Sequence, residues 1–374
     1  MNTPSPAVLH PAAAEPTLPA SPAAPPARQY GLDGLRILAI CGVVAIHVVG
    51  LYVVKADHRS GGRWWLATAI DIGAIWTVPV FVMISGALLL SPRAHRAGPA
   101  VFYRKRFVRI LPALVVWHLV YLLVVRVALR GEELDPTKIG TLLIDARVYT
   151  ALYFLWLIAG LYVITPVLAT FLADGGRRRA YVTAAVALGW TMGAFMISGA
   201  ASLLHAPRPI SLGAWTMWWP YVGYFLAGWA LHHVRLRGWR LVAVLLGTAV
   251  LLAEGVWRWG SKPDLPVVQA LFPVSYVGTT VALAAIGVFL VGISLGARLR
   301  PSERIGRLIV RLSDASFGVF LVHLLLLALI QWAFPEWPLG KSLTATLLTC
   351  VGVIVGSFAV SLGAARVPYL RAIF

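Results

Sequence analysis

"GLDGLRILAICGVVAIHVVG", residues 31–50, places an arginine and a histidine inside an apolar run that is long enough to cross a membrane. A helix rises 1.5 Å per residue, so about 20 residues span the roughly 30 Å hydrocarbon core of a bilayer. Ionisable side chains are rare in such segments because removing them from water is costly. This stretch therefore indicates both the fold class and a candidate functional site.

The composition supports the same fold class for the whole chain. Hydrophobic residues make up 59% of the 374 residues, charged residues make up 12%, and the mean hydropathy is +0.81. These values are typical of integral membrane proteins and not of soluble domains. We therefore predict an all-α integral membrane fold, a bundle of about ten transmembrane helices. The ten spans are expected at residues 34–54, 68–90, 108–129, 150–172, 181–200, 214–231, 240–257, 268–295, 314–334 and 342–364.

Two domains follow from this pattern: an Ala- and Pro-rich tail over residues 1–29, predicted to be disordered, and a transmembrane domain over residues 30–374. The net charge of +18 arises from short basic clusters between apolar runs, which topology and anionic lipid explain better than a nucleic-acid partner. Lys and Arg are more frequent on the side that carries the N-terminus. The positive-inside rule therefore predicts that both termini are cytoplasmic.

Arg36 and His47 are eleven residues apart in the first span, about 16 Å along a helix and within roughly 20° of one face. Arg36 would lie near the inner surface, either as an anchor that reaches lipid headgroups or as a site residue. His47 would lie near the middle of the membrane, either as a core histidine bonded to a neighbour or as a functional group. A neutral imidazole is suited to removing a proton from a hydroxyl.

Arg106 and Arg109 share a helical face where the third span begins, and such a pair either binds phosphate or sets topology. The sequence has no Walker or Rossmann glycine loop, so a coenzyme site would have to be built from arginines and helix ends. His118, at a depth similar to that of His47, is a rival base or a histidine bonded to a neighbouring helix. Cys41 and Cys350 both lie in predicted spans, and no metal-ligand spacing is present.

Six stretches occur in the order found in one protein family. They are "LDGLRILAICGVVAIH" (32–47), "VPVFVMISGALLL" (78–90), "RKRFVRILPALVVW" (104–117), "LYFLWLIAGLYVITPVL" (152–168), "YVGYFLAGWAL" (221–231) and "SDASFGVFLVH" (313–323). On these residues the chain resembles the acyltransferase-3 family of bacterial membrane proteins, from Tyr30 to about Pro335. The resemblance implies ten core spans and transfer of acyl groups, usually acetyl, from cytoplasmic acyl-CoA to hydroxyls of cell-envelope glycans, exopolysaccharide precursors or related molecules.

The resemblance also implies roles for particular residues. His47 would be the catalytic base, while Arg36 would hold a phosphate or the polar arm of the coenzyme, or order the histidine. Arg106 and Arg109 would bind coenzyme A, which is a substrate and not a resident cofactor. The weaker candidates for lining the substrate site are Ser85, Tyr153, Trp156, Tyr162 and His323. Two of these depart from the family pattern: a Trp is commoner where Tyr153 stands, and Trp156 replaces another type of aromatic residue.

A transporter or lipid translocator is the alternative, because a bundle with buried charge also suits a substrate pathway. It would predict internal symmetry. The sequence has no convincing inverted repeat, and His47 has no obvious mate in the second half of the chain. We therefore expect a multi-pass acyltransferase of the bacterial cytoplasmic membrane, with an acyl-CoA donor, a glycan or lipid-linked saccharide acceptor and membrane lipid as partners.

Overall fold

The computed structural model describes residues 30–54, 59, 61–370 and 373–374, and every regular element in these ranges is a helix. The all-α fold is therefore confirmed, while the predicted disordered tail at residues 1–29 lies outside the described residues. In chain order the helices are α1 (Tyr30–Val53), α2 (Gly62–Asp71), η2 (Ile72–Ala74), α3 (Thr77–Leu89), α4 (Pro92–His95), α5 (Gly98–Leu119), η3 (Val120–Leu129), α6 (Pro136–Ile144), α7 (Tyr153–Ala173), α8 (Gly176–Leu203), η4 (Trp219–Tyr221), α9 (Val222–Leu231), α10 (Gly238–Ser261), α11 (Pro266–Leu271), α12 (Thr279–Gly296), α13 (Glu303–Ala333) and α14 (Leu343–Ala364).

Nine helices among the described residues are long and apolar enough to cross a membrane, one fewer than the ten predicted. The difference lies in the sixth predicted span, residues 214–231. Its α-helix is α9, whose 10 residues rise about 15 Å and cannot cross a hydrocarbon core alone. Pro220 precedes α9 within the 3-10 turn η4, and a proline lacks the N–H that a longer helix would need at this point.

The segment that contains η4 and α9 nevertheless runs back alongside most of the length of α8. At one end the rings of Phe195 and Trp219 stack at 6.3 Å. At the other end His232 lies in electrostatic contact with Arg177. These two contacts are about 27 Å apart along α8, which is close to a membrane thickness. Turns and short helices thus make the pass that the sequence suggested as one regular helix.

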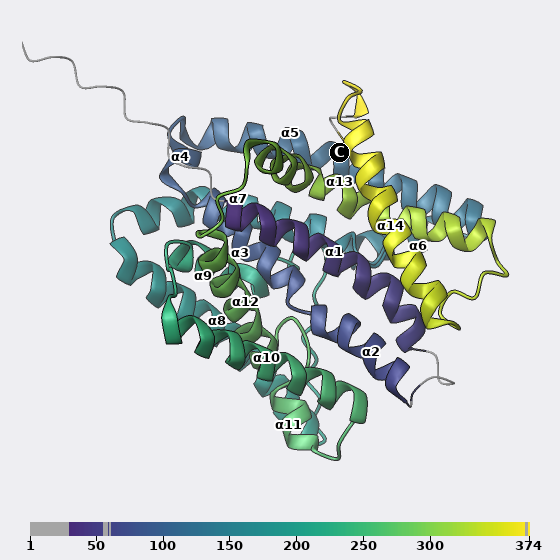
Figure 1. The fold of residues 1–374 in the computed structure, drawn as a ribbon, viewed down its shortest axis with the longest axis horizontal. Coiled ribbons are helices and arrows are strands. Elements are labelled where there is room, and N and C mark those ends of the chain that lie inside the picture. Colours follow the sequence, from purple (N-terminus) through teal and green to yellow (C-terminus); the bar gives the residue numbers. More distant parts are fainter. Residues whose placement is uncertain (1–29, 55–58, 60, 371–372) are drawn as a thin grey trace, which may run out of the picture.

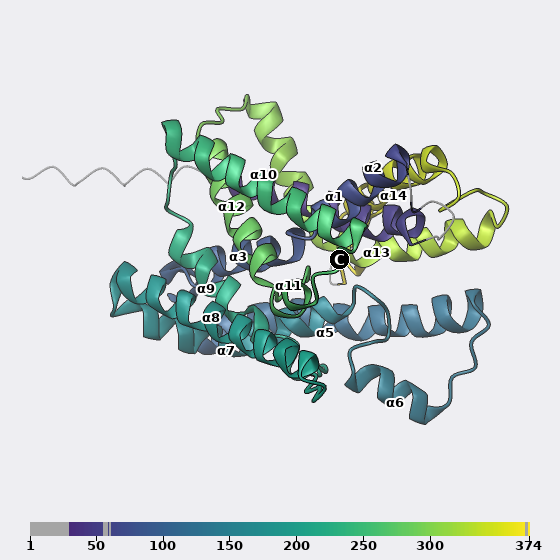
Figure 2. The same cartoon turned by 90° about the horizontal axis from the view of Figure 1, so that it is seen from below.

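Helix α1 lies at the centre of the bundle and contacts α2, α3, α12, α13 and α14 (Figures 1 and 2). It runs parallel to α13, because Arg36 contacts Ser313 and His47 contacts His323 further along both helices. Glycines allow the close approach of neighbouring helices: Gly31 packs directly on the backbone of Gly296 in α12. These contacts leave Arg36 and His47 of α1 partly buried within the bundle.

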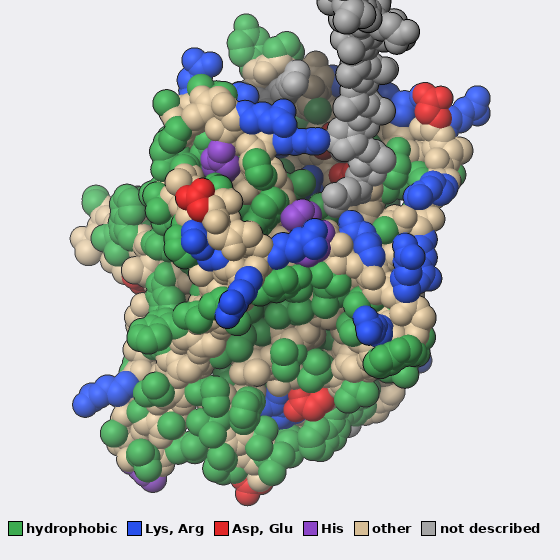
Figure 3. Space-filling model, turned by 90° about the vertical axis from the view of Figure 1, so that its left-hand side faces the viewer, with side chains coloured by type: hydrophobic (Ala, Val, Ile, Leu, Met, Phe, Trp, Pro, Cys, Tyr) green, Lys and Arg blue, Asp and Glu red, His purple; other side chains and the backbone are tan. Residues whose placement is uncertain are grey.

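Lys and Arg side chains are spread over the end of the molecule at which α1 begins, as Figure 3 shows. We call this the arginine-rich end; it carries the exposed basic residues of segments 104–109, 177–178 and 304–311. Helix α14 finishes towards the same end, since Ser361 in its last turn donates a hydrogen bond to the Ala315 carbonyl (2.8 Å) in the first half of α13, close to Ser313, which contacts Arg36. The start of α1 and the end of α14 therefore lie on the same side of the bundle. That this side faces the cytoplasm stays a prediction.

The arginine-rich end also contains a partly buried histidine where α9 ends. The Nδ1 atom of His232 hydrogen-bonds the Trp229 carbonyl at 2.6 Å. Burial lowers the pKa of His232, and Arg235 and Arg177 lower it further. The charged form of His232 is therefore disfavoured, and the positive charge of this end comes mainly from its arginines and lysines.

Candidate active site

Two histidines from separate spans meet in the core of the bundle. The ring centroids of His47 on α1 and His323 on α13 are 5.4 Å apart, with the ring planes inclined by 36°. His323 is completely buried, with 0% of its surface exposed, whereas His47 is only partly buried. Of the two residues, His47 is therefore the one with exposed surface. We call these residues the histidine pair.

The hydrogen bonds of His323 determine which of its nitrogens carries the proton. Its Nδ1 atom lies 2.7 Å from the Phe320 carbonyl oxygen and 3.2 Å from that of Val319. A carbonyl can only accept a hydrogen bond, so Nδ1 carries the proton and donates it. Nε2 then holds a lone pair, and it is buried without a hydrogen-bond partner among the described residues. A buried acceptor of this kind is available to an N–H of the adjacent His47.

Partly buried phenylalanines connect the histidine pair to two other helices. Phe320, on α13, has its ring centroid 6.1 Å from that of His323 and 5.3 Å from that of Phe154 on α7. Phe154 in turn lies 6.2 Å from Phe81 on α3. The second and fourth spans, which carry motifs identified from the sequence, thus lie beside the histidine pair.

Arg36 lies towards the arginine-rich end of the same helix, about 16 Å from His47 along α1. Its Nη1 atom donates a hydrogen bond to Ser313 Oγ at 3.3 Å. It also lies within electrostatic range of Asp33, Asp314 and Arg109. The side chain is partly buried and held by α13, so it does not extend freely to a lipid surface.

Arg36, Arg106 and Arg109 converge on one residue, as all three lie within electrostatic range of the Tyr162 hydroxyl on α7. We call these three arginines the arginine cluster. Arg109 is exposed and places its Cζ atom 5.4 Å from the Phe317 ring centroid. The Nε atom of Arg106 is buried with no hydrogen-bond partner among the described residues. Guanidinium groups arranged in this way favour an anion with several oxygens, such as a phosphate.

The rival base, His118, is fully engaged in hydrogen bonds. Its Nδ1 atom donates to the Leu114 carbonyl at 2.6 Å, and its Nε2 atom accepts a hydrogen bond from Trp156 Nε1 at 3.0 Å. Neither nitrogen remains to take a proton from a substrate. Trp156, a candidate for lining the substrate site, is therefore turned towards His118, and its ring also contacts Trp215 at 5.9 Å.

Two further predicted residues, Ser85 and Tyr153, make contacts other than to the histidine pair. Ser85 donates its hydroxyl to the Phe81 carbonyl of its own helix at 2.9 Å, as expected of a residue in packing and not of a nucleophile. Tyr153 lies next to Phe154, and its hydroxyl interacts with those of Tyr221 and Tyr276. Among the described residues, no three or more His, Cys, Asp or Glu side chains gather as metal ligands would.

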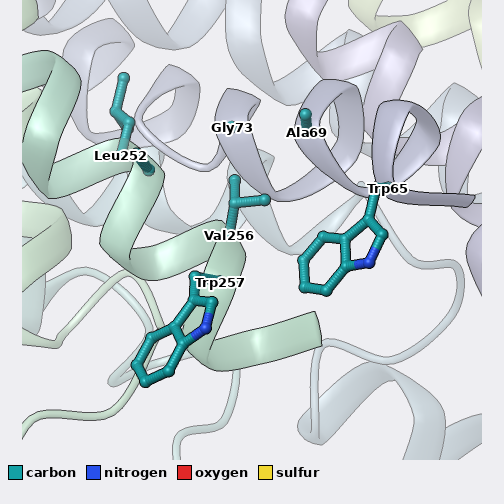
Figure 4. Close-up of a pocket in the computed structure, with 7 residues that line it drawn as sticks. Trp65, Ala69, Gly73, Leu252, Val256 and Trp257 are labelled. Carbon is teal, nitrogen blue, oxygen red and sulfur yellow. The ribbon is translucent and has the colours of Figure 1, made fainter. Parts of the chain in front are cut away.

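An apolar groove lies between the segment α2–η2 and helix α10. Figure 4 shows Trp65, Ala69 and Gly73 on one wall and Leu252, Val256 and Trp257 on the other. None of the lining side chains is titratable or nucleophilic, so the groove carries no group for acid–base catalysis. The candidate chemistry lies at the histidine pair instead.

A comparison with protein families identifies the chain. A family model described as an acyltransferase domain matches residues 29–364. The chain belongs to the acyltransferase-3 family. It is a multi-pass membrane acyltransferase, as the six motifs indicated. The chain has no significant match among curated proteins or solved structures.

One buried carboxylate of this acyltransferase was not among the residues expected from the sequence. Asp71 ends α2, has 8% of its surface exposed and packs its carboxylate against Gly50, one turn of α1 beyond His47. The signal was present, since Asp71 is an acidic residue inside the apolar run of the second span.

Proposed function

We propose that this protein transfers an acetyl group from acetyl-CoA to a hydroxyl of a cell-envelope glycan or lipid-linked saccharide, in the cytoplasmic membrane of a bacterium. The observation that carries the proposal is the contact between His47 and His323 in the core of the bundle. The arginine cluster lies further along α1, towards the arginine-rich end. A base buried within reach of an anion site suits a reaction between a phosphorylated acyl donor and a hydroxyl.

His47 acts as the general base of the reaction. One ring nitrogen of His47 takes the proton as the O–H bond of the acceptor breaks, while the other donates its N–H towards Nε2 of His323. The acceptor oxygen forms a bond to the thioester carbonyl carbon, and the C–S bond breaks when the tetrahedral intermediate collapses. The coenzyme A thiolate leaves and takes a proton from His47, so the products are an ester and free coenzyme A.

His323 serves as a positioning residue in this scheme. Its Nδ1 proton is committed to the Phe320 carbonyl, which leaves Nε2 as a fixed acceptor beside His47. A fixed acceptor selects the His47 tautomer whose second nitrogen is free to act as a base. It also stabilises the imidazolium that forms when His47 takes the proton. This is the role that a carboxylate plays beside the histidine of many hydrolases.

The arginine cluster binds the phosphates of acetyl-CoA in this proposal. Arg109 is exposed at the arginine-rich end, whereas Arg36 is partly buried, so the cluster leads from solvent into the bundle. The separation of about 16 Å along α1 between Arg36 and His47 suits the extended pantetheine arm between the phosphates and the thioester. The positive-inside rule favours a cytoplasmic location for this end, where acetyl-CoA is available.

The test of the base is the His47→Ala variant. Membrane vesicles that contain the protein and its native acceptors are incubated with acetyl-CoA labelled with ¹⁴C in the acetyl group, and alkali-labile label in the envelope fraction is measured. We expect the variant to insert and fold normally but to incorporate no label above a vesicle control that lacks the protein. Retained turnover would show that His47 is not the base.

The donor site is tested with the Arg106→Gln and Arg109→Gln double variant. We expect the acetyl-CoA concentration that gives half-maximal rate to rise at least tenfold, because two charge-assisted contacts to phosphate are lost. The matched control is Arg177→Gln and Arg178→Gln, which removes two exposed charges from the same end without touching the cluster. Equal effects of the two double variants would indicate a general electrostatic role.

A further inference from the structure

Four polar side chains gather on the opposite side of the histidine pair from the arginine cluster. They are Asp71 on α2, Tyr153 on α7, Tyr221 in η4 and Tyr276 before α12. The hydroxyl of Tyr153 interacts with those of Tyr221 and Tyr276, and Tyr276 lies within electrostatic range of Asp71. The four residues therefore form one cluster, which we call the carboxylate–tyrosine cluster.

The position of this cluster along the bundle follows from contacts with α1. The Trp64 indole donates a hydrogen bond to the Val53 carbonyl at the far end of α1, at 3.1 Å, so α2 enters from the side opposite the arginine-rich end. Asp71 then reaches Gly50, where a Cβ would lie 3.4 Å from its carboxylate. Gly50 is three residues beyond His47 and so lies close to the same face of α1, about one turn further along.

The three tyrosines belong to segments that also lie towards the side opposite the arginine-rich end. Helix α7 runs antiparallel to α5, since the Tyr103 hydroxyl near the start of α5 donates to the Val163 carbonyl in the middle of α7 (2.8 Å), whereas His118 near the end of α5 accepts from Trp156 near the start of α7 (3.0 Å). Tyr153 therefore starts α7 at the end remote from the arginines. Tyr224, one turn beyond Tyr221, donates its hydroxyl to the Tyr276 carbonyl at 2.7 Å and joins the other two segments.

The carboxylate–tyrosine cluster contains a buried carboxylate and lies beside an unsatisfied hydroxyl. Asp71 has 8% of its surface exposed, and its side chain makes no capping hydrogen bond to η2, the helix that follows it. The hydroxyl of Ser275, next to Tyr276 in the chain, is buried without a hydrogen-bond partner among the described residues. Buried polar groups are normally satisfied, so an unsatisfied one beside a reactive centre indicates a ligand with complementary groups.

Resting on the function proposed above, we propose that the carboxylate–tyrosine cluster is the acceptor subsite and binds a polyhydroxyl compound such as a saccharide. The Asp71 carboxylate accepts hydrogen bonds from sugar hydroxyls, and the tyrosine hydroxyls donate or accept as the bound sugar requires. The acceptor enters from the side opposite the arginine-rich end and presents one hydroxyl to His47. Donor and acceptor thus meet at the histidine pair from opposite faces of the membrane.

The kinetic test uses Asp71→Asn, which keeps the size of the side chain and replaces one acceptor oxygen by a donor. With ¹⁴C-acetyl-CoA and vesicles that contain native acceptors, we expect the maximal rate to fall at least tenfold while the half-saturating concentration of acetyl-CoA stays unchanged. Asp174→Asn is the matched control, because Asp174 is exposed at the end of α7 and far from the cluster. Folding of each variant is checked by size-exclusion chromatography.

The outcomes separate this proposal from the function on which it rests. Alkali-labile incorporation that disappears in His47→Ala but is unchanged in Asp71→Asn would overturn the acceptor subsite and leave the acyl transfer standing. No incorporation by the unmodified protein would overturn the proposed function itself. A rise in the acetyl-CoA requirement of Asp71→Asn would assign Asp71 to the donor site and would also overturn the subsite.

A second measurement tests the direction of entry without relying on activity. Tyr276→Cys and Arg109→Cys are made separately in a background in which Cys41 and Cys350 are alanine. A membrane-impermeant sulfonated maleimide is then added to intact cells or to inside-out vesicles. We expect label at position 276 only in intact cells and label at position 109 only in inside-out vesicles. Labelling of both from one side, or no labelling at 276, would overturn the proposal.

Discussion

Replacing His323 by asparagine tests the roles of its two ring nitrogens separately, because the two nitrogens lie in different environments. The Nδ2 amide of asparagine occupies nearly the place of the histidine Nδ1 atom and can still donate to the Phe320 carbonyl, now at 2.7 Å from Nδ1. Nothing in the variant replaces Nε2, the buried acceptor beside His47. His323→Asn therefore removes the proposed support of the base and retains the local hydrogen bond of α13.

The expected loss of activity follows from the role of the missing nitrogen. General base catalysis contributes about 10²–10⁴-fold to a rate, and an incorrectly oriented base loses most of that contribution. We expect the maximal rate of acetyl transfer to fall at least about a hundredfold, which is about 2.7 kcal/mol of activation free energy. The stability cost is that of a smaller side chain at a fully buried site, on the order of 1–2 kcal/mol.

His118→Asn is the matched control for this prediction. His118 is also buried and also donates its Nδ1 proton to a carbonyl of its own helix, that of Leu114. We expect both variants to lose similar stability in thermal unfolding, whereas only His323→Asn loses transfer of ¹⁴C-acetyl. If the two variants lost equal activity, or if His323→Asn kept a rate within threefold of the unmodified protein, the proposed role of Nε2 would be refuted.

Three further predictions concern packing and positioning. Gly86→Ala should destabilise the protein by about 1–3 kcal/mol or more and so lower its thermal unfolding midpoint, because a Cβ there would overlap the Phe225 carbonyl of α9. Gly352→Ala is the control, since Gly352 faces open space, and equal midpoints of the two variants would contradict this packing. Tyr121→Phe removes a hydroxyl that bridges the Leu321 carbonyl and the Leu325 N–H on either side of His323. We expect a severalfold lower maximal rate with unchanged acetyl-CoA binding in a radioligand assay, and an unchanged rate would argue against a positioning role of this hydroxyl. Arg258→Met should destabilise the protein by about 1–3 kcal/mol in denaturant titrations, because the Phe272 carbonyl loses the hydrogen bond from Arg258 and partly exposed Glu254 loses its ion-pair partner; a variant of unchanged stability would count against this anchor.

The fold class was predictable from the sequence because membrane helices obey a simple length and composition rule. The central helix that carries Arg36 and His47 appears where the apolar run predicted it, and the ion pair of Glu254 and Arg258, at 2.7 Å, follows from their spacing of four residues. The composite pass around α9 was not predictable by the same rule. Mean hydropathy does not distinguish a regular helix from a turn and a short helix buried among neighbours.

The pairing of His47 with His323 was beyond the sequence for a different reason. The two residues lie on helices that are far apart along the chain, and periodicity specifies the face of a residue but not the partner of that face. The same limit applies to Trp156, whose aromatic character was recognised but whose orientation towards His118 depends on how α5 and α7 pack. Asp71 was identifiable as costly in a membrane span, yet its position beside Gly50 required the structure.

The positions of the polar groups account for the cost of burying them. Arg36 is held by Ser313 near one end of α1, the histidine pair occupies the middle, and Asp71 lies one turn further on. Each group has protein partners on a neighbouring helix, because α1 contacts α2, α3, α12, α13 and α14, and such partners lower the cost of placing a polar group in a membrane span. A polar path through the protein along one helix is of little use for stability, since apolar residues would pack there at lower cost. Along α1 the arginine cluster comes first, the histidine pair second and the carboxylate–tyrosine cluster third. This order matches an anionic donor and a hydroxylated acceptor that approach the same base from opposite ends of the bundle.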